Sequence, residues 1–259
     1  MKKALLVGIN DYPGTFCDLM GCVNDVQNMQ DLLTSLFGFR KEDICILTDR
    51  DATALNILKA LEMLVYDAKP GDQLIFHYSG HGSQVPDTSG DEKDRWDEIL
   101  CPYDLDWSEN VVRDDDLNRI FETVPAGVHV EVFLDSCHSG TGLRALEGEY
   151  RKQRFLPVPV EVMGSCTPVK SIKPIKPAKV QVLWAACRSN QYAADALLNG
   201  KYGGAFTTFL CDLVRSSQGT ISRKDLLTTL RKGLKANRFA QVPQLETGTK
   251  LKKARILAA

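Results

Sequence analysis

A cysteine and a histidine each follow a short apolar run in this sequence. Cys137 comes after Val130–Leu134, whose residues predict a buried strand, and His81 follows the similar run Gln73–Tyr78. Open α/β sheets place their reactive groups at the carboxyl ends of such strands. A thiol needs a base to become a nucleophile, so this pair predicts cysteine-based nucleophilic catalysis.

The other histidines are weaker candidates for that base. His77 and His81 are four residues apart but lack the glutamate and the helix of a zinc-protease H-E-x-x-H motif, so His77 is interpreted as structural. His138 should point to the opposite face of the strand end from Cys137, because side chains alternate along a strand. His129 opens the same strand and is expected to pack.

Two aspartates lie near the ends of predicted elements. Asp135 and Cys137 should share a strand face, roughly 7 Å apart. Asp25 falls near the start of a predicted helix. Each also has an ordinary structural interpretation, Asp25 at a helix N-terminus and Asp135 in a turn.

The two motifs resemble those of a known family. H-Y-S-G-H-G at His77–Gly82, followed by D-S-C-H-S-G at Asp135–Gly140, is similar to the histidine and cysteine motifs of caspase-like peptidases, and of the minimal prokaryotic-type metacaspases (orthocaspases) in particular. Lys3–Asp11, Gly21–Val26 and Trp184–Asp195 resemble further metacaspase segments in the expected order. The resemblance is weakest between about Leu143 and Lys179.

The resemblance implies a fold and a set of site residues. It implies an α/β fold, a caspase-like αβα sandwich around a mostly parallel six-stranded core sheet. His81 and Cys137 would form the catalytic dyad, with the backbone N–H groups of Cys137 and Gly82 as oxyanion donors. The pocket for the residue before the cleaved bond would contain Cys22, Asp25, Ser79 and Asp135.

Two carboxylates in one pocket favour a basic substrate side chain and reject aspartate. Arginine is expected over lysine, because a guanidinium can form two parallel hydrogen bonds with a carboxylate. The predicted function is therefore a cysteine endopeptidase that cleaves proteins or peptides after arginine or lysine.

Calcium is a candidate cofactor, since many metacaspases are activated by it. Asp97, Asp114 and Asp115 fall where the resemblance places three calcium-binding acids, and their oxygens suit a hard cation. The fourth expected acid is Arg144 here, and its positive charge should weaken the site. We therefore expect activity with no required cofactor and little need for calcium.

Composition indicates which partners and which cellular location the protein is expected to have. The 259 residues have a formal net charge of −1, which disfavours nucleic-acid and membrane-surface partners, and no segment is apolar for long enough to span a membrane. Eight cysteines without a C-x-x-C pair suggest neither zinc nor disulfides, hence a reducing, cytoplasmic location. A monomer is expected.

Apolar periodicity predicts alternating strands and helices in one peptidase domain over residues 1–259. Strands are expected at Ala4–Ile9, Ile44–Leu47, Gln73–Tyr78, near Val130–Leu134, at Val180–Ala186 and at Gln244–Glu246, and helices at Asn24–Phe37, after Thr53, at Leu117–Phe121 with Asp114 as N-cap, at Ala205–Val214 and from Ser222 to about Leu234. The stretch between Gly82 and Asp114 is interpreted as a long acidic loop. Residues 1–142 and 180–259 would correspond to the large and small caspase subunits.

The segment 143–179 is interpreted as an irregular linker because five prolines interrupt it. Its basic residues, Arg144, Arg151, Lys152, Arg154, Lys170, Lys173, Lys176 and Lys179, are expected in exposed backbone, where the enzyme could cut itself. Without cutting, the segment would be an ordinary solvated loop.

Two alternatives belong to other classes. A catalytically silent caspase-like scaffold would bind partners only, and labelling by a thiol-directed peptidyl inhibitor would distinguish it. A doubly wound nucleotide-binding domain is disfavoured because no phosphate-binding glycine motif occurs.

Overall fold

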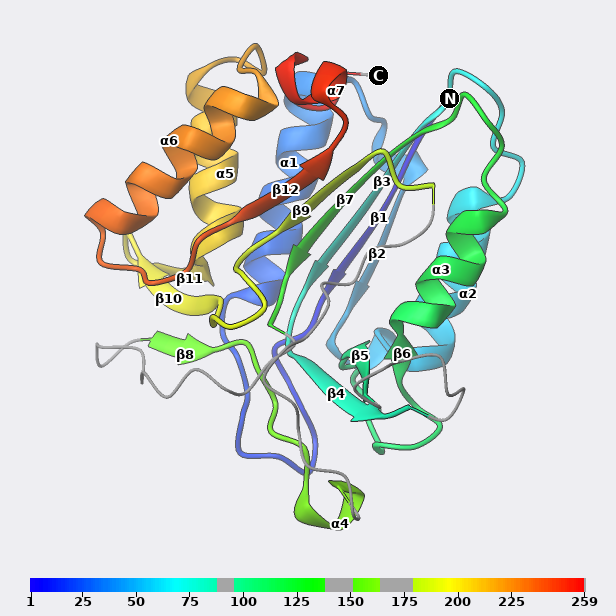
Figure 1. The fold of residues 1–259 in the computed structure, drawn as a ribbon, viewed down its shortest axis with the longest axis vertical. Coiled ribbons are helices and arrows are strands. Elements are labelled where there is room, and N and C mark those ends of the chain that lie inside the picture. Colours follow the sequence, from blue (N-terminus) through cyan, green and yellow to red (C-terminus); the bar gives the residue numbers. More distant parts are fainter. Residues whose placement is uncertain (88–95, 138–150, 164–178, 259) are drawn as a thin grey trace.

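A six-stranded sheet forms the centre of the molecule (Figure 1). The computed structural model describes residues 1–87, 96–137, 151–163 and 179–258. The strand order is β12-β9-β7-β3-β1-β2, and all neighbours are parallel except the edge pair β12 and β9. The bounds are β1 Lys2–Gly8, β2 Ile44–Thr48, β3 Gln73–Ser79, β7 His129–Asp135, β9 Val182–Ala185 and β12 Gln244–Thr247.

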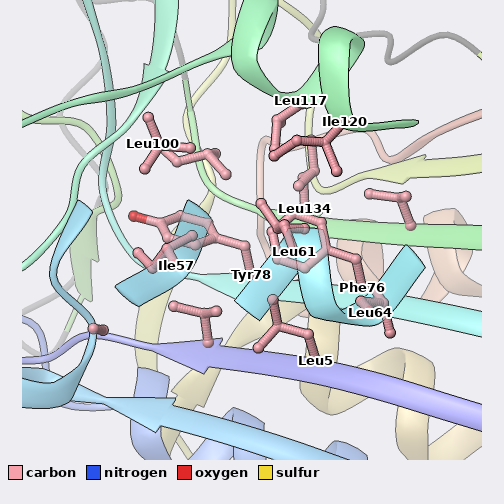
Figure 2. Packing of buried hydrophobic residues seen from close by; sticks show 14 of the residues in the cluster. Leu5, Ile57, Leu61, Leu64, Phe76, Tyr78, Leu100, Leu117, Ile120 and Leu134 are labelled. Atoms are coloured by element: carbon pink, nitrogen blue, oxygen red, sulfur yellow. The ribbon is translucent and has the colours of Figure 1, made fainter. Parts of the chain in front are cut away.

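Helices cover both faces of this sheet, as Figure 1 shows. One face carries α1 (Cys22–Phe37), α5 (Ala205–Ser216) and α6 (Arg223–Ala236), and the other carries α2 (Ala54–Val65) and α3 (Asp114–Glu122). In Figure 2, Ile57 of α2 lies beside Tyr78 of β3, Leu61 of α2 lies near Phe76, and Leu117 of α3 belongs to the same buried cluster. Burial on both faces explains why the central strands are mostly apolar, and the buried Glu131 of β7 is paired with Arg223.

Two small sheets lie beyond the carboxyl ends of the central strands. One has the order β4-β5-β6, with bounds β4 Gly82–Pro86, β5 Trp96–Leu100 and β6 Val112–Arg113. The other has the order β11-β10-β8, with bounds β8 Arg151–Gln153, β10 Ala194–Leu198 and β11 Lys201–Gly204. The described elements also include two short α-helices, α4 (Val160–Met163) and α7 (Thr249–Lys253), and two 3-10 helices, η1 (Lys41–Asp43) and η2 (Asp49–Asp51).

The structure agrees with the predicted α/β fold and with most predicted elements, and it corrects three interpretations. The interpretation of the stretch from Gly82 to Asp114 as a loop is wrong, because this stretch contains the strands of the β4-β5-β6 sheet. The linker is not irregular throughout, because its described part holds β8 and α4, with Pro157 and Pro159 between them. The N-cap of α3 is Arg113 rather than Asp114.

Two further observations concern membranes and cysteines. Within the described ranges, no helix has the length and apolar content required to cross a bilayer. The seven cysteines of the described residues are all free thiols.

Candidate active site

The ends of two adjacent strands bring the histidine and cysteine motifs together. Strands β3 and β7 pair in parallel, and their last residues, Ser79 and Asp135, are partners in the register. His81 and Cys137 each follow two residues later. The buried apolar strands therefore fix both backbones at the same edge of the central sheet.

His81 is buried and held from two sides. Its Nε2 lies 2.5 Å from the carbonyl oxygen of Cys17, and the Tyr12 hydroxyl accepts a hydrogen bond from its backbone N–H at 2.7 Å. A carbonyl only accepts, so Nε2 carries the proton and Nδ1 keeps a lone pair. Within the described residues Nδ1 has no hydrogen-bond partner. Burial lowers the pKa of His81 to about 4, so the ring is neutral at pH 7 and can accept a proton.

Cys137 is buried between the backbone of Ala193 and a second thiol. Its Sγ accepts a hydrogen bond from the N–H of Ala193 at 2.6 Å. A hydrogen bond to Cys137, together with burial, raises the pKa of the Cys187 thiol well above its ordinary value. Cys187 is therefore a protonated neighbour of Cys137, and the Ala193 N–H can stabilise negative charge on the Cys137 sulfur.

The carbonyl of Arg154 lies between two backbone donors of this site. Its oxygen accepts hydrogen bonds from the N–H of Cys137 and from the N–H of Gly82, each at 3.1 Å. These are the two groups that the resemblance implies as oxyanion donors. The geometry is that of a carbonyl polarised by two backbone N–H groups.

The side chain of Arg154 fills a buried pocket lined by three carboxylates. Nη2 contacts Asp25 at 2.7 Å and Asp195 at 3.0 Å, and Nη1 contacts Asp135 at 3.2 Å. Nη1 also donates to the hydroxyl of Ser79 at 2.7 Å. We call this site, made by Asp25, Ser79, Asp135 and Asp195, the specificity pocket. The guanidinium of Arg154 therefore contacts three different carboxylates and does not form two parallel hydrogen bonds with a single one.

Other groups position these acids. Asp25 accepts hydrogen bonds from the N–H of Gly204 and from Ser79, and Asp135 accepts two from Thr207. Burial raises the pKa of Asp25 to about 7, Arg154 opposes this rise, and the charge of Asp135 adds to it. The pocket is thus held for a cation, because an empty pocket would leave these buried acids repelling one another.

Cys22, the last predicted pocket residue, lies beside this group. It is buried at the start of α1, and its side chain hydrogen-bonds to Ser79. Burial raises the pKa of its thiol well above the ordinary value. Cys22 is therefore a neutral part of the pocket wall.

The chain around Arg154 crosses the site as an added strand. Arg151–Gln153 pair antiparallel with β10, and the N–H of Arg154 continues this ladder to Ala193 O at 3.0 Å. Beyond the carbonyl, the N–H of Leu156 donates to Gly82 O at 3.1 Å. We call residues 151–156 the substrate-like segment. Arg154 is fully buried, so the expectation that the basic residues of this region lie in exposed backbone is wrong for this residue.

His77 and His129 have partners other than Cys137 and His81. His77 is buried against the Thr207 hydroxyl at 3.3 Å, and burial lowers its pKa to about 3. His129 contacts Glu131, which also pairs with Arg223. His138 and Arg144 lie outside the described residues.

The predicted calcium acids gather around Asp97 on β5. Burial, then the nearby charges of Asp87, Asp114 and Asp115, raise the pKa of Asp97 to about 7. Its Oδ2 lies 3.3 Å from Nε of Arg113. No group of three potential ligands is arranged to hold a metal ion in the described part of the chain.

Sequence reasoning did not identify Asp195, Ala193 or Arg154 as parts of the site. Asp195 is the last residue of Trp184–Asp195, a segment that resembles a metacaspase segment, and this position could have identified it as a site residue. Ala193, in the same motif, contributes only backbone groups, which residue identity does not reveal. Arg154 was one of eight basic residues of its region, and nothing in the sequence distinguished it from the others.

Fold and site together define a caspase-like cysteine peptidase architecture. Residues 2–146 match the family model of the metacaspase, peptidase C14 domain. The Metacaspase-1 of Coccidioides immitis is 37% identical, over 94% of this chain and 61% of its own length. The chain belongs to the metacaspase family, and it spans about 61% of that relative.

Two solved structures share the fold. A crystal structure of a Geobacter sulfurreducens protein superposes with a TM-score of 0.72 at 25% identity, covering 100% of this chain and 98% of that one. Caspase-1 from Spodoptera frugiperda gives a TM-score of 0.61 at 16% identity, covering 95% and 86%. The caspase likeness extends to the fold alone.

Proposed function

We propose that this chain is a cysteine endopeptidase that cleaves after arginine in preference to lysine, and that it cuts its own Arg154–Phe155 bond. The observation that carries the proposal is the double placement of Arg154. Its guanidinium occupies the acidic specificity pocket while its carbonyl accepts from the N–H groups of Cys137 and Gly82. A substrate needs both placements at the same time to be cut at that bond.

The proposed reaction uses the dyad in two steps. Nδ1 of His81 takes the thiol proton, and the Cys137 sulfur attacks the Arg154 carbonyl carbon. The two backbone N–H groups stabilise the oxyanion that forms. The C–N bond then breaks, His81 returns the proton to the amine of Phe155, and water hydrolyses the thioester at Cys137.

Self-cleavage can be tested by mass spectrometry of the purified chain. Wild type should yield a new N-terminus at Phe155, and Cys137→Ala, His81→Ala and Arg154→Gln should remain uncut at that bond. The matched control is Lys179→Gln, because Lys179 is an exposed basic residue of the same region. An uncut wild type, or cutting at Phe155 in Cys137→Ala, would refute the assignment.

The preference for arginine follows from the distribution of contacts in the specificity pocket. A guanidinium has two terminal nitrogens, and in Arg154 these serve three carboxylates, whereas a lysine amine has one nitrogen for the same set. Removing one partner of a buried charge pair costs about 2–5 kcal/mol. Asp135→Ala should therefore lower cleavage of arginine peptides more than tenfold without unfolding the protein, and Asp25→Ala should behave similarly.

This specificity is measured with peptide libraries on the variants and on wild type. An Asp135→Ala enzyme with unchanged arginine preference would contradict the pocket assignment, as would a wild-type enzyme that cuts after aspartate.

We also propose that activity needs little calcium, because Arg113 lies beside Asp97 and Arg144 replaces the fourth acid. EGTA should leave most of the activity intact. Arg144→Asp should raise the response to calcium, since it supplies a carboxylate in place of a cation. Loss of wild-type activity in EGTA, with recovery in millimolar calcium, would contradict this.

A further inference from the structure

The substrate-like segment has a second arginine in a defined environment, three residues before Arg154. The guanidinium carbon of Arg151 lies 4.2 Å from the centre of the Phe239 ring. Its Nη1 donates to the carbonyl of Arg238 at 2.8 Å, and its Nη2 donates to the carbonyl of Asn237 at 3.1 Å. One face of this cation is therefore covered by an aromatic ring, and both terminal nitrogens are hydrogen-bonded.

These partners suit a cation for two reasons. Asn237 is the C-cap of α6, and carbonyls at a helix C-terminus carry the negative end of its dipole. An aromatic face attracts a guanidinium through its quadrupole. Neither interaction requires a carboxylate.

The environment is also held in place by the rest of the protein. Phe239 is buried, packs edge-on against Phe209, and donates its N–H to Leu234 O at 2.9 Å. Arg238 has a left-handed backbone with φ 60°, which ends α6 and turns the chain toward Phe239. The ring and the two carbonyls are thus fixed by α6 and its packing.

Strand pairing sets which substrate residue reaches this environment. Arg151 is the register partner of Ala196 on β10, and Lys152 is that of Asp195. Any peptide that adds to β10 with arginine in the specificity pocket presents its side chain three residues earlier to Phe239.

We propose that Phe239 and the carbonyls of Asn237 and Arg238 form a second cation subsite, which selects arginine three residues before the residue at the cleaved bond. The preferred substrates are peptides of the form Arg-x-x-Arg. This inference rests on the proposed cleavage after Arg154 and adds a second determinant to it. Lysine at this position binds less well, because its single nitrogen cannot meet both carbonyls while facing the ring.

Self-cleavage provides the first test. Freshly translated chains in a cell-free system are followed by the loss of the uncut band in wild type, Arg151→Ala, Arg151→Lys, Phe239→Leu and the Arg151→Ala/Phe239→Leu double variant. Arg151→Ala should slow cutting about fivefold to tenfold. Arg151→Lys should lie between Arg151→Ala and wild type.

The double variant separates recognition from folding. If Arg151 acts through the ring of Phe239, the double variant cuts no more slowly than the slower single variant. Independent effects that multiply, or wild-type cutting by Arg151→Ala, would overturn the proposal. The same substitutions in Cys137→Ala chains, measured by melting temperature, show whether the fold is retained.

Synthetic peptides provide the second test, and it does not depend on a Phe239 variant. Peptides with the sequence of residues 151–158 are given to wild-type enzyme, with arginine or alanine at the first position. The arginine peptide should have a kcat/KM about fivefold to tenfold higher. Cleavage of both at equal rates overturns the second subsite and leaves cleavage after arginine intact. If neither peptide nor the chain itself is cut after Arg154, the proposed function fails and this inference fails with it.

Discussion

At the scale of single residues, burial decides the protonation states that the site needs. Burial lowers the pKa of His81 to about 4, so its ring is neutral at pH 7 and Nδ1 keeps its lone pair. His77 lies on β3 two residues before Ser79 of the pocket, and burial lowers its pKa to about 3. Asp25 shows the opposite shift, since burial disfavours the charged form of an acid and of a histidine alike.

These opposite shifts predict how stability depends on pH. An unfolded histidine titrates near pH 6.5, whereas native His77 has a pKa of about 3. Below pH 6.5 the unfolded chain therefore binds a proton that the native chain does not bind at His77. The free energy of unfolding that neutral His77 contributes is lost as the pH falls toward 4. Asp25 acts in the opposite direction between about pH 4 and 7, because its native pKa is raised. The pH dependence of the total free energy of unfolding therefore does not show the contribution of His77. That contribution is obtained by comparing variants with and without His77.

We predict that the stability difference between Cys137→Ala and its His77→Gln derivative shrinks as the pH is lowered. The change should be roughly 1.4 kcal/mol per pH unit between pH 6.5 and 4, because glutamine does not titrate. Urea unfolding of both uncut proteins at several pH values measures it. A difference that stays constant over this range would contradict the assignment of a neutral, buried His77.

At the scale of elements, the hairpin of β10 and β11 completes the site. It supplies Asp195, the ladder that holds the substrate-like segment, and Gly204 at the floor of the specificity pocket. A Cβ added at Gly204 would clash with the Asp135 carboxylate and would lie 2.6 Å from Nη1 of Arg154. The backbone at Gly204 has φ −66°, which alanine adopts without strain. The conflict of an alanine there is the contact of its methyl group with Asp135 and Arg154.

Gly204→Ala should therefore abolish cleavage after arginine while the protein stays folded. We expect at least a tenfold loss, because the methyl group occupies the volume of the guanidinium. Gly248→Ala is the matched control, since its φ is also −66° and a Cβ there meets only open space. Self-cleavage and melting temperature measure both variants. Near wild-type cutting by Gly204→Ala would show that Arg154 does not need this pocket.

The elements also show why the sequence predicted part of the site and not the rest. His81 and Cys137 could be placed because apolar strands end directly before each, and Asp135 follows from the alternation of β7. Asp195 and Gly204 belong to a hairpin whose strands are short and whose burial pattern is mixed, so no periodicity marked it. Arg154 depends on long-range pairing between β8 and β10, which a local pattern does not encode.

At the scale of the whole molecule, the proposed cut divides a chain whose halves share one sheet. Strand β7 belongs to residues 1–154 and β9 to residues 155–259, and the two strands pair along four register positions. The helix layer is divided in the same way, because Val26 and Met29 of α1 pack in one cluster with Phe206 and Leu210 of α5. The specificity pocket also draws on both parts, with Asp25 and Asp135 before the cut and Asp195 after it.

We therefore predict that the cut chain remains one particle. The cut breaks only the bond between Arg154 and Phe155. It leaves the pairing of β7 with β9 and the shared helix layer intact, and the apolar surface buried in these contacts holds the two fragments together. Under native conditions the fragments 1–154 and 155–259 should elute together in gel filtration and should separate only in urea or detergent. The uncut Cys137→Ala chain is the control for elution volume. Separation of the fragments in native buffer would mean that the sheet does not hold the two parts together, and a pocket with acids on both sides of the cut could not then survive cleavage.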